Sequence, residues 1–404
     1  MKIVLLSGGS GERLYPLSNT VMSKQFLRIL ENNESMLQRI FRQISLYYSV
    51  DDIYVVAPNI QVELINTQIP IKKDNIIIEP SRRGTYAAIR LASAYFQDGE
   101  TICVVPVDSY VDDEFFGILQ QIPHNDKISL VGITPTYPSE KYGYIVSEET
   151  GYTFKEKPDK QLAERYIANG ALWNAGIFSF NTKLFNDNYL DLLNNYDKIE
   201  KTSFDYAVLE KQHDFNVVPY SGEWKDLGTW DTLSEEMNIE NNNVVINNCS
   251  NTHVINFLDK SAVVSGINDG IVVFAEDGIL VSSKEDAKKI KQLIPDNRPF
   301  YEEKRWGEYR VIGKGDKYLV KELYLLPHKE ISYQSHNHRE ESWTIVSGYG
   351  TVVINDEIIE VGVGDVVNIA KKQKHKIMSG ENGIKFIEVQ IGDILEESDI
   401  IRYR

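Results

Sequence analysis

Cysteine is scarce in this sequence, and the two cysteines present form no recognisable pair. Cys103 and Cys249 are far apart and lack the short spacing of a metal-binding or redox motif. Cys103 lies in the apolar run TICVVP (Thr101–Pro106), which predicts a buried strand and a reduced thiol. A disulfide-stapled scaffold and a cysteine-based zinc site are therefore excluded.

Basic residues and long hydrophobic runs are also in short supply. Lysine and arginine number 43 against 59 aspartates and glutamates, so the formal net charge is −16. A field of this sign repels nucleic-acid backbones and anionic lipid surfaces. No uncharged apolar run reaches the ~18 residues of a membrane-spanning helix, and the apolar stretch at the amino terminus is too short for a signal peptide. We therefore expect a soluble cytoplasmic protein with no nucleic-acid or membrane partner.

The 404 residues are enough for two or three domains. Up to about residue 235, apolar strands alternate with amphipathic helices, which predicts an α/β, Rossmann-like domain with a mixed, mostly parallel sheet. From about residue 240 the runs are short, β-rich and broken by Asn, Asp and Gly, and a charged helix over Lys284–Leu293 follows. Beyond Arg305, closely spaced strands predict a small closed β-barrel. We expect domains over 1–238, 239–295 and 296–404.

A glycine-rich segment directly follows the first expected strand. It reads GGSGERLYPLS over Gly8–Ser18, and Lys24 comes shortly after it. Glycines let backbone N–H groups approach an anion closely, while Arg13 and Lys24 add positive charge. Leu14 stands where a dinucleotide fingerprint has its third glycine, and no GK[ST] ending follows. The segment therefore predicts a phosphate-binding loop of another kind, the alternative being a glycine-rich turn with solvated cations.

Further motifs follow this loop in a fixed order. They are SKQFL (Ser23–Leu27), EPSRRGT (Glu79–Thr85), VPVD (Val105–Asp108), GITPTYP (Gly132–Pro138), YGYI (Tyr142–Ile145), FKEKPD (Phe154–Asp159), WNAGIF (Trp173–Phe178), FDYAVLEK (Phe204–Lys211) and WKDLGTW (Trp224–Trp230). The series resembles the bacterial mannose-1-phosphate guanylyltransferase family of nucleotide-sugar pyrophosphorylases. The resemblance covers essentially the full length and extends to the long form of that family, which carries a type II phosphomannose isomerase-like cupin domain at its carboxyl end.

The resemblance implies a nucleotidyltransferase that forms GDP-mannose and pyrophosphate from GTP and mannose-1-phosphate, serves polysaccharide biosynthesis and works as a homodimer. In this reaction a sugar-phosphate oxygen attacks the α-phosphorus, so catalysis depends mainly on alignment and on neutralising phosphate charge. Mg²⁺ is the implied cofactor, and a hard cation of this kind prefers carboxylate oxygens. Another base or another sugar-1-phosphate stays open as an alternative.

The resemblance also assigns site residues. The catalytic set is Arg13, Lys24, Asp108 and Asp226, the two aspartates holding Mg²⁺; the nucleotide-binding set is Gly8, Gly9, Gly11, Glu79, Arg83 and Thr85; the sugar-phosphate-binding set is Gly143, Glu156, Lys157 and Asn174. Taken alone, each aspartate could equally be a capping or turn residue. Ser23 replaces a usual proline, while Tyr86 and the pair Glu140–Lys141 depart from the family pattern near the expected base and sugar pockets.

The carboxy-terminal part contains an expected metal site. Gln334, His336 and His338 alternate, so they share one face of a strand. Gln334, His336, Glu341 and the distant His375 have the spacing of a cupin metal site, with glutamine in place of the first histidine. Such ligands suit Zn²⁺, Mn²⁺ or Fe²⁺. A register that uses His338, and a barrel with a polar interior but no metal, are the alternatives.

This segment resembles the isomerase pattern SLQxHxHRxEHW, with Ser342 in place of the final histidine. The sequence also ends at DIIRYR (Asp399–Arg404), where isomerase-competent members continue. Isomerisation of mannose-6-phosphate and fructose-6-phosphate needs an acid/base pair and stabilisation of an enediolate. We therefore expect this activity to be absent or feeble. A bifunctional enzyme and a non-catalytic sugar-nucleotide sensor are the competing hypotheses, and the retained metal and phosphate residues disfavour the sensor.

Overall fold

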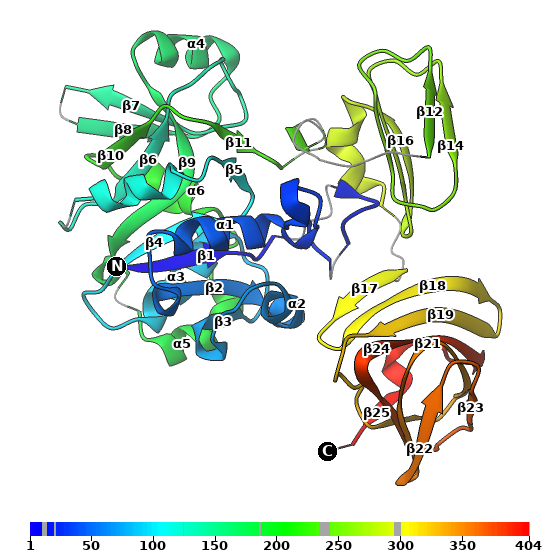
Figure 1. The fold of residues 1–404 in the computed structure, drawn as a ribbon. Coiled ribbons are helices and arrows are strands. Elements are labelled where there is room, and N and C mark those ends of the chain that lie inside the picture. Colours follow the sequence, from blue (N-terminus) through cyan, green and yellow to red (C-terminus); the bar gives the residue numbers. More distant parts are fainter. Residues whose placement is uncertain are drawn as a thin grey trace.

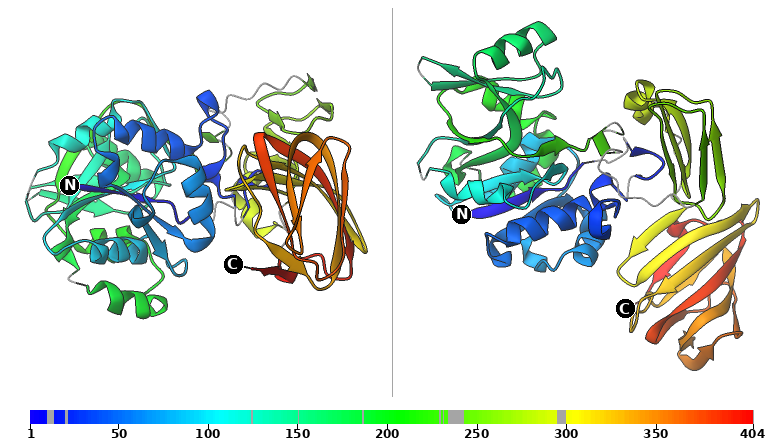
Figure 2. Two further views of the ribbon diagram at one scale, coloured as in Figure 1. Left: turned by 60° about the horizontal axis from the view of Figure 1, so that its bottom comes forward. Right: turned by 45° about the horizontal axis from the view of Figure 1, so that its top comes forward.

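The computed structural model describes residues 1–9, 14–19, 22–123, 125–149, 151–185, 187–228, 230, 232–233, 243–294 and 300–403. These residues form an α/β domain, a small β module and a carboxy-terminal β domain that lie beside one another (Figures 1 and 2). The expected boundaries at 238/239 and 295/296 fall outside the described residues and stay predictions. Among the described helices, none is long and apolar enough to cross a membrane.

A nine-stranded mixed sheet forms the centre of the amino-terminal domain. Its strands are β1 (Lys2–Leu6), β2 (Ile53–Pro58), β3 (Ile76–Glu79), β4 (Thr101–Pro106), β6 (Ser129–Ile133), β7 (Tyr144–Glu148), β8 (Gly151–Lys155), β9 (Leu172–Asn181) and β10 (Asn216–Tyr220). The order is β10-β6-β9-β4-β1-β2-β3, with β7 between β8 and β9. β1 is parallel to β2 and β4, and β9 runs antiparallel to β4 and β6. The predicted mixed, mostly parallel sheet is confirmed.

Helices cover both faces of this sheet (Figure 1). They are α1 (Met36–Ser45), α2 (Val62–Gln68), α3 (Thr85–Tyr95), α4 (Lys160–Ala168), α5 (Tyr189–Asn194) and α6 (Phe204–Ala207). Successive residues of β1 enter different cores, because strand side chains alternate: Leu5 packs with Ile40 of α1, and Val4 packs with Ala88 of α3. The short apolar runs of the sequence are thus buried on both sides.

In the small β module, short strands wind into a coil and form two parallel pairs and one antiparallel pair. Its strands are β12 (Val244–Asn247), β13 (His253–Asn256), β14 (Ala262–Ser265), β15 (Gly270–Ala275) and β16 (Gly278–Ser283). β12 pairs in parallel with β14, and β13 with β15. Polar side chains 18 positions apart also bond, as Asn251 does to Asp269. The segment expected to be a helix over Lys284–Leu293 is a 3-10 helix confined to Asp286–Gln292.

The carboxy-terminal domain is a curled antiparallel sheet. Its strands are β17 (Tyr301–Lys304), β18 (Gly307–Gly315), β19 (Tyr318–Leu325), β20 (Gln334–His336), β21 (Arg339–Ile354), β22 (Glu357–Gly362), β23 (Val366–Ile369), β24 (His375–Gly392) and β25 (Ile400–Arg402). β24 lies against β19, β20 and β21. The sheet curls around a core containing Leu325, Trp343 and Phe386. The described order runs from β17 to β25, and β22 and β23 each pair only with β21, so the cupin-type domain expected from the sequence takes the form of a curled antiparallel sheet.

Candidate functional site

Lys24 and Asp108 meet at the carboxyl ends of the parallel strands. Lys24 begins a short 3-10 helix, Lys24–Phe26, and Asp108 follows β4. Lys24 Nζ lies 2.8 Å from Asp108 Oδ2, with 11% of the lysine side chain and 39% of the aspartate side chain exposed. Ser23, the residue in place of the usual proline, accepts a 2.8 Å hydrogen bond from the buried Gln61 amide. The Lys24 side chain is therefore held in a mostly buried position, whereas the Asp108 carboxylate is exposed to solvent.

Asp226 reaches the same place through a two-stranded ribbon. β11 (Trp224–Asp226) pairs antiparallel with β5 (Ser109–Val111), and Asp226 lies opposite Ser109. The Leu227 amide donates to the Asp108 carbonyl at 3.2 Å. The structure thus brings together two aspartates that are remote in sequence. Their carboxylates are the oxygen donors that Mg²⁺ prefers, so the residues fit a magnesium site.

Glu79, at the end of β3, lies beside the glycine loop. It is 3% exposed, and its Oε1 accepts hydrogen bonds from the Tyr196 hydroxyl at 2.9 Å and the Arg83 amide at 3.4 Å. Burial raises the pKa of this carboxyl, and the bond from Tyr196 opposes that rise. A methyl group on Gly8 would come within 2.8 Å of Glu79 Oε2, so only glycine allows this approach. Gly8 and Glu79 are therefore neighbours, as expected for one nucleotide pocket.

Arg83 and Thr85 contact the segment over 199–204. Arg83 donates through Nε and Nη2 to the Ile199 carbonyl at 2.9 and 2.6 Å. Thr85 Oγ1 accepts from the Phe204 amide at 2.9 Å. Gly84 between them has φ of 86°, and a side chain there would strike the Thr202 carbonyl. Through these contacts Arg83 and Thr85 hold the segment over 199–204 in place. Their expected contacts with the nucleotide stay predictions.

The four expected sugar-phosphate residues lie together. The Asn174 amide donates to the Gly143 carbonyl at 2.8 Å, which joins β9 to the start of β7. A methyl group on Gly143 would lie 2.8 Å from Glu156 Oε2. Glu156 forms an ion pair with Lys157, whose backbone φ is 43°. Burial alone would lower the pKa of Lys157, but the hydrogen bond to Glu156 and the negative charges of Glu156 and its neighbours together raise that pKa.

Asp205 belongs to this group and was not singled out from the sequence. It lies on α6, in the FDYAVLEK motif, and its Oδ1 accepts a 3.1 Å hydrogen bond from Asn174 Nδ2. Burial, and then the charge of Glu156, raise the pKa of Asp205 to about 6. A half-buried carboxyl beside Glu156 and Asn174 is suited to sugar hydroxyls, which both donate and accept. The FDYAVLEK motif was noted in the sequence, but nothing in it distinguished Asp205 as a residue of the site.

Of three further residues expected in the glycine loop, only Gly9 lies within the described residues. Gly11 and Arg13 lie outside the described residues, so their assignments stay predictions. Gly9 is described, and a methyl group on it would meet no heavy atom within 4 Å. Its backbone therefore borders open space, as a phosphate-binding loop requires.

The departures Tyr86 and Glu140 have structural contacts. The Tyr86 ring packs 6.0 Å from the Phe185 ring and 5.5 Å from the Arg90 guanidinium. Glu140 Oε1 accepts a 3.2 Å hydrogen bond from the Lys160 amide, at the first residue of α4. These contacts explain the two residues through packing and helix capping.

The carboxy-terminal domain brings together His336, Glu341 and His375. Their ligand atoms all lie within 4.8 Å of one another, and the three side chains are buried. His336 Nε2 is 3.0 Å from Glu341 Oε1, and His375 Nε2 is 3.6 Å from Glu341 Oε2. The structure thus brings three of the four expected residues together, and their role as metal ligands stays a prediction. Gln334 lines the same cavity, but its Oε1 accepts a hydrogen bond from Ser332.

The donor set of this cluster fits a transition metal. His375 Nδ1 lies 2.9 Å from the Gln373 carbonyl, so it carries the proton and leaves Nε2 as a lone pair. That Nε2 is buried and has no hydrogen-bond partner among the described residues. Burial lowers the pKa of His375, which keeps the ring neutral and able to bind metal. Burial alone would raise the pKa of Glu341, but His336 and the nearby charges lower it.

Arg339 competes with a metal at this place and was missed by the sequence reasoning. Its Nε donates to Glu341 Oε1 at 3.0 Å, and its Nη2 lies 3.4 Å from His336 Nε2. His338 is exposed, so the register that uses it is wrong. Ser342 alternates with the inward-facing Glu341 and Trp343 and does not line the cavity, so its exchange for histidine removes no cavity group.

Comparison with known proteins agrees with both halves of this geometry. Residues 2–243 match the family model of the nucleotidyl transferases, and residues 298–404 match that of the mannose-6-phosphate isomerase C-terminal domain. The first match covers more than half of the chain.

The chain belongs to the nucleotidyl transferase family. This nucleotidyl transferase is 29% identical to the mannose-1-phosphate guanylyltransferase of Escherichia coli K12, over 99% of this chain and 97% of that protein. It is 28% identical to the xanthan biosynthesis protein XanB of Xanthomonas campestris pv. campestris B100, over 99% and 97%. The crystal structure of mannose-1-phosphate geranyltransferase from Thermus thermophilus is similar, with a TM-score of 0.60 and 26% identity over 72% of this chain and 97% of that one.

Proposed function

We propose that this nucleotidyl transferase forms GDP-mannose and pyrophosphate from GTP and mannose-1-phosphate. The observation that carries the proposal is the meeting of Lys24, Asp108 and Asp226 at one edge of the sheet. A cation and two carboxylates at the carboxyl ends of parallel strands are what phosphoryl chemistry in such a fold requires. The full-length similarity to a mannose-1-phosphate guanylyltransferase supports the choice of substrates.

Each group has a defined task in this proposal. Asp108 and Asp226 hold Mg²⁺, which supplies charge neutralisation at the phosphates. Lys24 binds the triphosphate, and its bond to Asp108 keeps it at the reacting phosphate. Lys157 binds the phosphate of the sugar, and Glu156 holds the lysine in the charged form. Alignment of the two phosphates, rather than a covalent nucleophile, then lowers the barrier.

Recognition of the sugar follows from the buried polar groups. Glu156, Asn174 and Asp205 offer acceptors and one amide donor close to the backbone of Gly143. A buried polar group left without a partner is costly, so a sugar that lacks the matching hydroxyl is rejected. The base is assigned to the neighbourhood of Gly8 and Glu79, where the Glu79 carboxylate can accept a hydrogen bond from a base amine.

The test is pyrophosphate release, measured with each of four nucleoside triphosphates against a panel of sugar-1-phosphates. GTP with mannose-1-phosphate is expected to give the highest kcat/KM. A strong preference for another pair would move the assignment to another nucleotide sugar. Absence of release with every pair would favour the sugar-nucleotide sensor.

A second activity, interconversion of mannose-6-phosphate and fructose-6-phosphate, is favoured by one observation. Glu341 of the His336–Glu341–His375 cluster lines a 620 Å³ cavity, together with Lys321, Arg339 and Glu388. The ion pair between Arg339 and Glu341 opposes the activity, because a metal must compete with it. Mannose-6-phosphate formation by the full chain, with Zn²⁺, Mn²⁺ or Co²⁺ added, decides between a bifunctional enzyme and a transferase with a structural cupin domain.

A further inference from the structure

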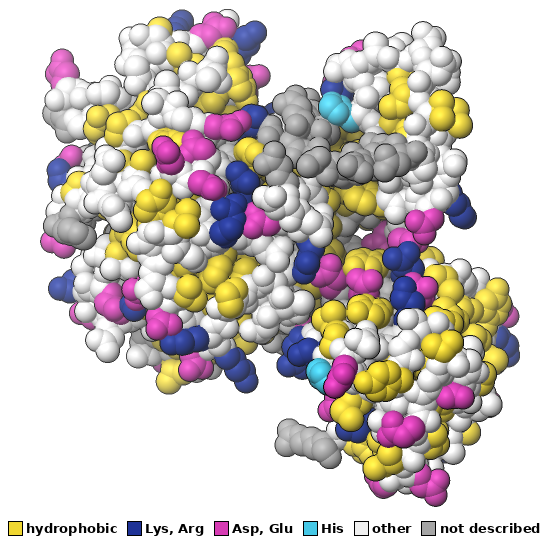
Figure 3. Space-filling view, in the orientation of Figure 1, with side chains coloured by type: hydrophobic (Ala, Val, Ile, Leu, Met, Phe, Trp, Pro, Cys, Tyr) yellow, Lys and Arg dark blue, Asp and Glu magenta, His cyan; other side chains and the backbone are white. Residues whose placement is uncertain are grey.

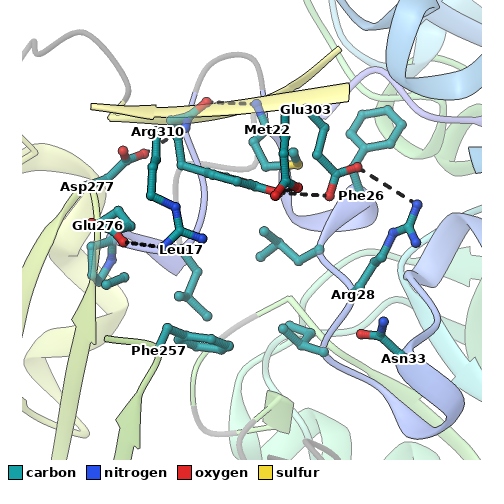
Figure 4. Close-up of a pocket in the computed structure, with 17 residues that line it drawn as sticks. Leu17, Met22, Phe26, Arg28, Asn33, Phe257, Glu276, Asp277, Glu303 and Arg310 are labelled. Atoms are coloured by element: carbon teal, nitrogen blue, oxygen red, sulfur yellow. Dashed lines mark hydrogen bonds and ion pairs between the residues drawn. The ribbon is translucent and has the colours of Figure 1, made fainter. Parts of the chain in front are cut away.

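A separate cavity lies where the three parts of the chain meet (Figure 4). Its volume is 440 Å³, and cavities of this size between domains are common small-molecule sites. Leu17 and Met22, which precede Lys24, form one wall. Phe257 of the β module and strands β17 and β18 of the carboxy-terminal domain form the others. None of these residues belongs to the candidate active site.

Two glutamates face each other in the wall of this cavity. Glu303 of β17 lies directly opposite Glu308 of β18, and both line the cavity. Like charges directly opposite each other destabilise a sheet. The Tyr301 hydroxyl donates to Glu308 Oε2 at 2.8 Å and is 3.4 Å from Glu303 Oε1, so its one proton does not satisfy both. Burial raises the pKa of Glu303, and the charge of Arg28 and hydrogen bonds from Tyr301 and Gln68 oppose that rise.

The nearby cations compensate this pair only in part, since Arg28 is the one cation that forms an ion pair with either glutamate among the described residues. Arg28 is 3.9 Å from Glu303, at the limit of an ion pair, and Arg310 pairs with Glu276 at 3.5 Å. Within the part of the chain that the structure describes, no lysine or arginine forms an ion pair with Glu308. The lining therefore holds an excess of carboxylates over guanidinium groups.

This composition excludes several ligand classes. A phosphate or nucleotide would be repelled by the carboxylates. Among the described residues, the acidic groups here do not converge as the His336–Glu341–His375 cluster does, so a metal ion lacks its ligands. A purely apolar ligand would leave the carboxylates without water. Phe257, which is 40% exposed, gives the cavity an aromatic wall, and such a wall together with carboxylates favours an organic cation (Figure 4).

We propose that this cavity binds a small organic cation, an ammonium or guanidinium compound. Its charge lies between Glu303 and Glu308, and its carbon skeleton packs toward Phe257. Binding then relieves the repulsion between the two glutamates.

The cavity is also connected to the phosphate-binding lysine. Asn19 donates to Asp277 Oδ2 of the β module at 2.8 Å, and the Met22 amide donates to Asn19 Oδ1 at 2.7 Å. Met22 directly precedes Ser23 and Lys24. A ligand that contacts Leu17 and Met22 therefore bears on the segment that carries Lys24. This second part of the inference, a change in KM for the nucleoside triphosphate, rests on the proposed function.

Thermal unfolding and calorimetry of the full chain test the binding without any turnover. Agmatine and glucosamine serve as cationic probes, glucose as the neutral probe and inorganic phosphate as the anionic probe, all at one ionic strength. We expect only the cationic probes to bind and to raise the midpoint of thermal unfolding, by about 2 °C or more. The variant E303Q/E308Q should lose at least tenfold in affinity for it. The same variant should have a higher midpoint without ligand, because the repulsion is gone.

The matched control is E357Q, which removes one exposed carboxylate on β22 and should change neither quantity. Binding of glucose or phosphate as tight as that of the cations, or no binding by any probe, would overturn the inference whatever the enzymatic activity proves to be. Cation binding with an unchanged KM for the triphosphate would overturn the connection to Lys24.

Discussion

At the scale of single residues, the candidate site contains two lysines, Lys24 and Lys157, each paired with a different carboxylate. Lys24 is mostly buried and bonded to Asp108, whereas Lys157 is half exposed and paired with Glu156. The residue types could be assigned from the sequence by resemblance to a family. Their meeting could not, because Asp108 and Asp226 are joined only by the pairing of two three-residue strands that no periodicity announces.

The two lysines should therefore respond differently to removal. Lys24→Ala is expected to lower kcat by several orders of magnitude, because its charge acts on the reacting triphosphate. Lys157→Ala should mainly raise KM for the sugar-1-phosphate. Steady-state kinetics with each substrate varied in turn measures this split. Equal effects of both variants on both substrates would show that Lys157 is misplaced.

Asp205 gives a prediction in stability as well as in binding. Its pKa of about 6 lies above the ordinary value near 3.8, so its ionised form is disfavoured in the folded protein. The resulting penalty is absent at low pH and grows as pH rises through that window, to at most about 3 kcal/mol. Asp205→Asn should therefore be more thermostable than the parent at pH 7.5 but not at pH 3.5. KM for the sugar-1-phosphate should rise in the same variant.

Thermal melts at both pH values, with Asp191→Asn on the neighbouring α5 as the control, check this expectation. A loss of stability at pH 7.5 would mean that Asp205 is held charged by partners.

At the scale of elements, sequence and structure agree best where apolar runs end at Gly, Pro or Ser. The run TICVVP is strand β4 to the residue, and the segment from Met36 is helix α1, opened by a capping box of Ser35 and Gln38. The parallel coil of the β module was not recognised. Its strands are only four to six residues long, and its repeat is visible mainly as polar ladders such as Ser250 with Asn268.

The elements β20, β21 and β24 should form a metal site together. The purified full chain is expected to retain about one equivalent of Zn²⁺ or Mn²⁺, because His375 is neutral and its Nε2 is available. His375→Ala should lose the metal, and His338→Ala, on the exposed side of the same region, should keep it. Elemental analysis after dialysis measures this. Metal-free parent protein under these conditions would mean that Arg339 has taken the place of the metal.

At the scale of the whole molecule, the three parts are held by a few polar bonds as well as by apolar packing. The Arg305 amide donates to Glu63 of α2 at 2.9 Å, and Asn19 donates to Asp277 at 2.8 Å. Hydrophobic side chains are also spread over the face of the carboxy-terminal domain that Figure 3 shows, and Ile358 and Val363 are 72% and 69% exposed. The geometry of the chain does not test the homodimer expected from the sequence, which therefore stays a prediction.

Removal of residues 296–404 should spare nucleotidyl transfer, because all the proposed catalytic groups lie in the amino-terminal domain. The truncated chain should be less soluble, since the apolar surface against which Tyr301 packs loses its cover. Pyrophosphate release and light scattering of the two forms compare these effects. A truncated chain that stays folded by circular dichroism but is inactive would show that the carboxy-terminal domain contributes to catalysis.

The central claim is that Asp108 and Asp226 act together in forming a nucleotide sugar. The most direct measurement is product identification by mass spectrometry, with GTP, mannose-1-phosphate and Mg²⁺, for the parent protein and for Asp226→Asn, together with a thermal melt of both. We predict GDP-mannose from the parent, a loss of most turnover in the variant and an unchanged melting midpoint. Near-normal GDP-mannose formation by a folded Asp226→Asn protein would contradict the account.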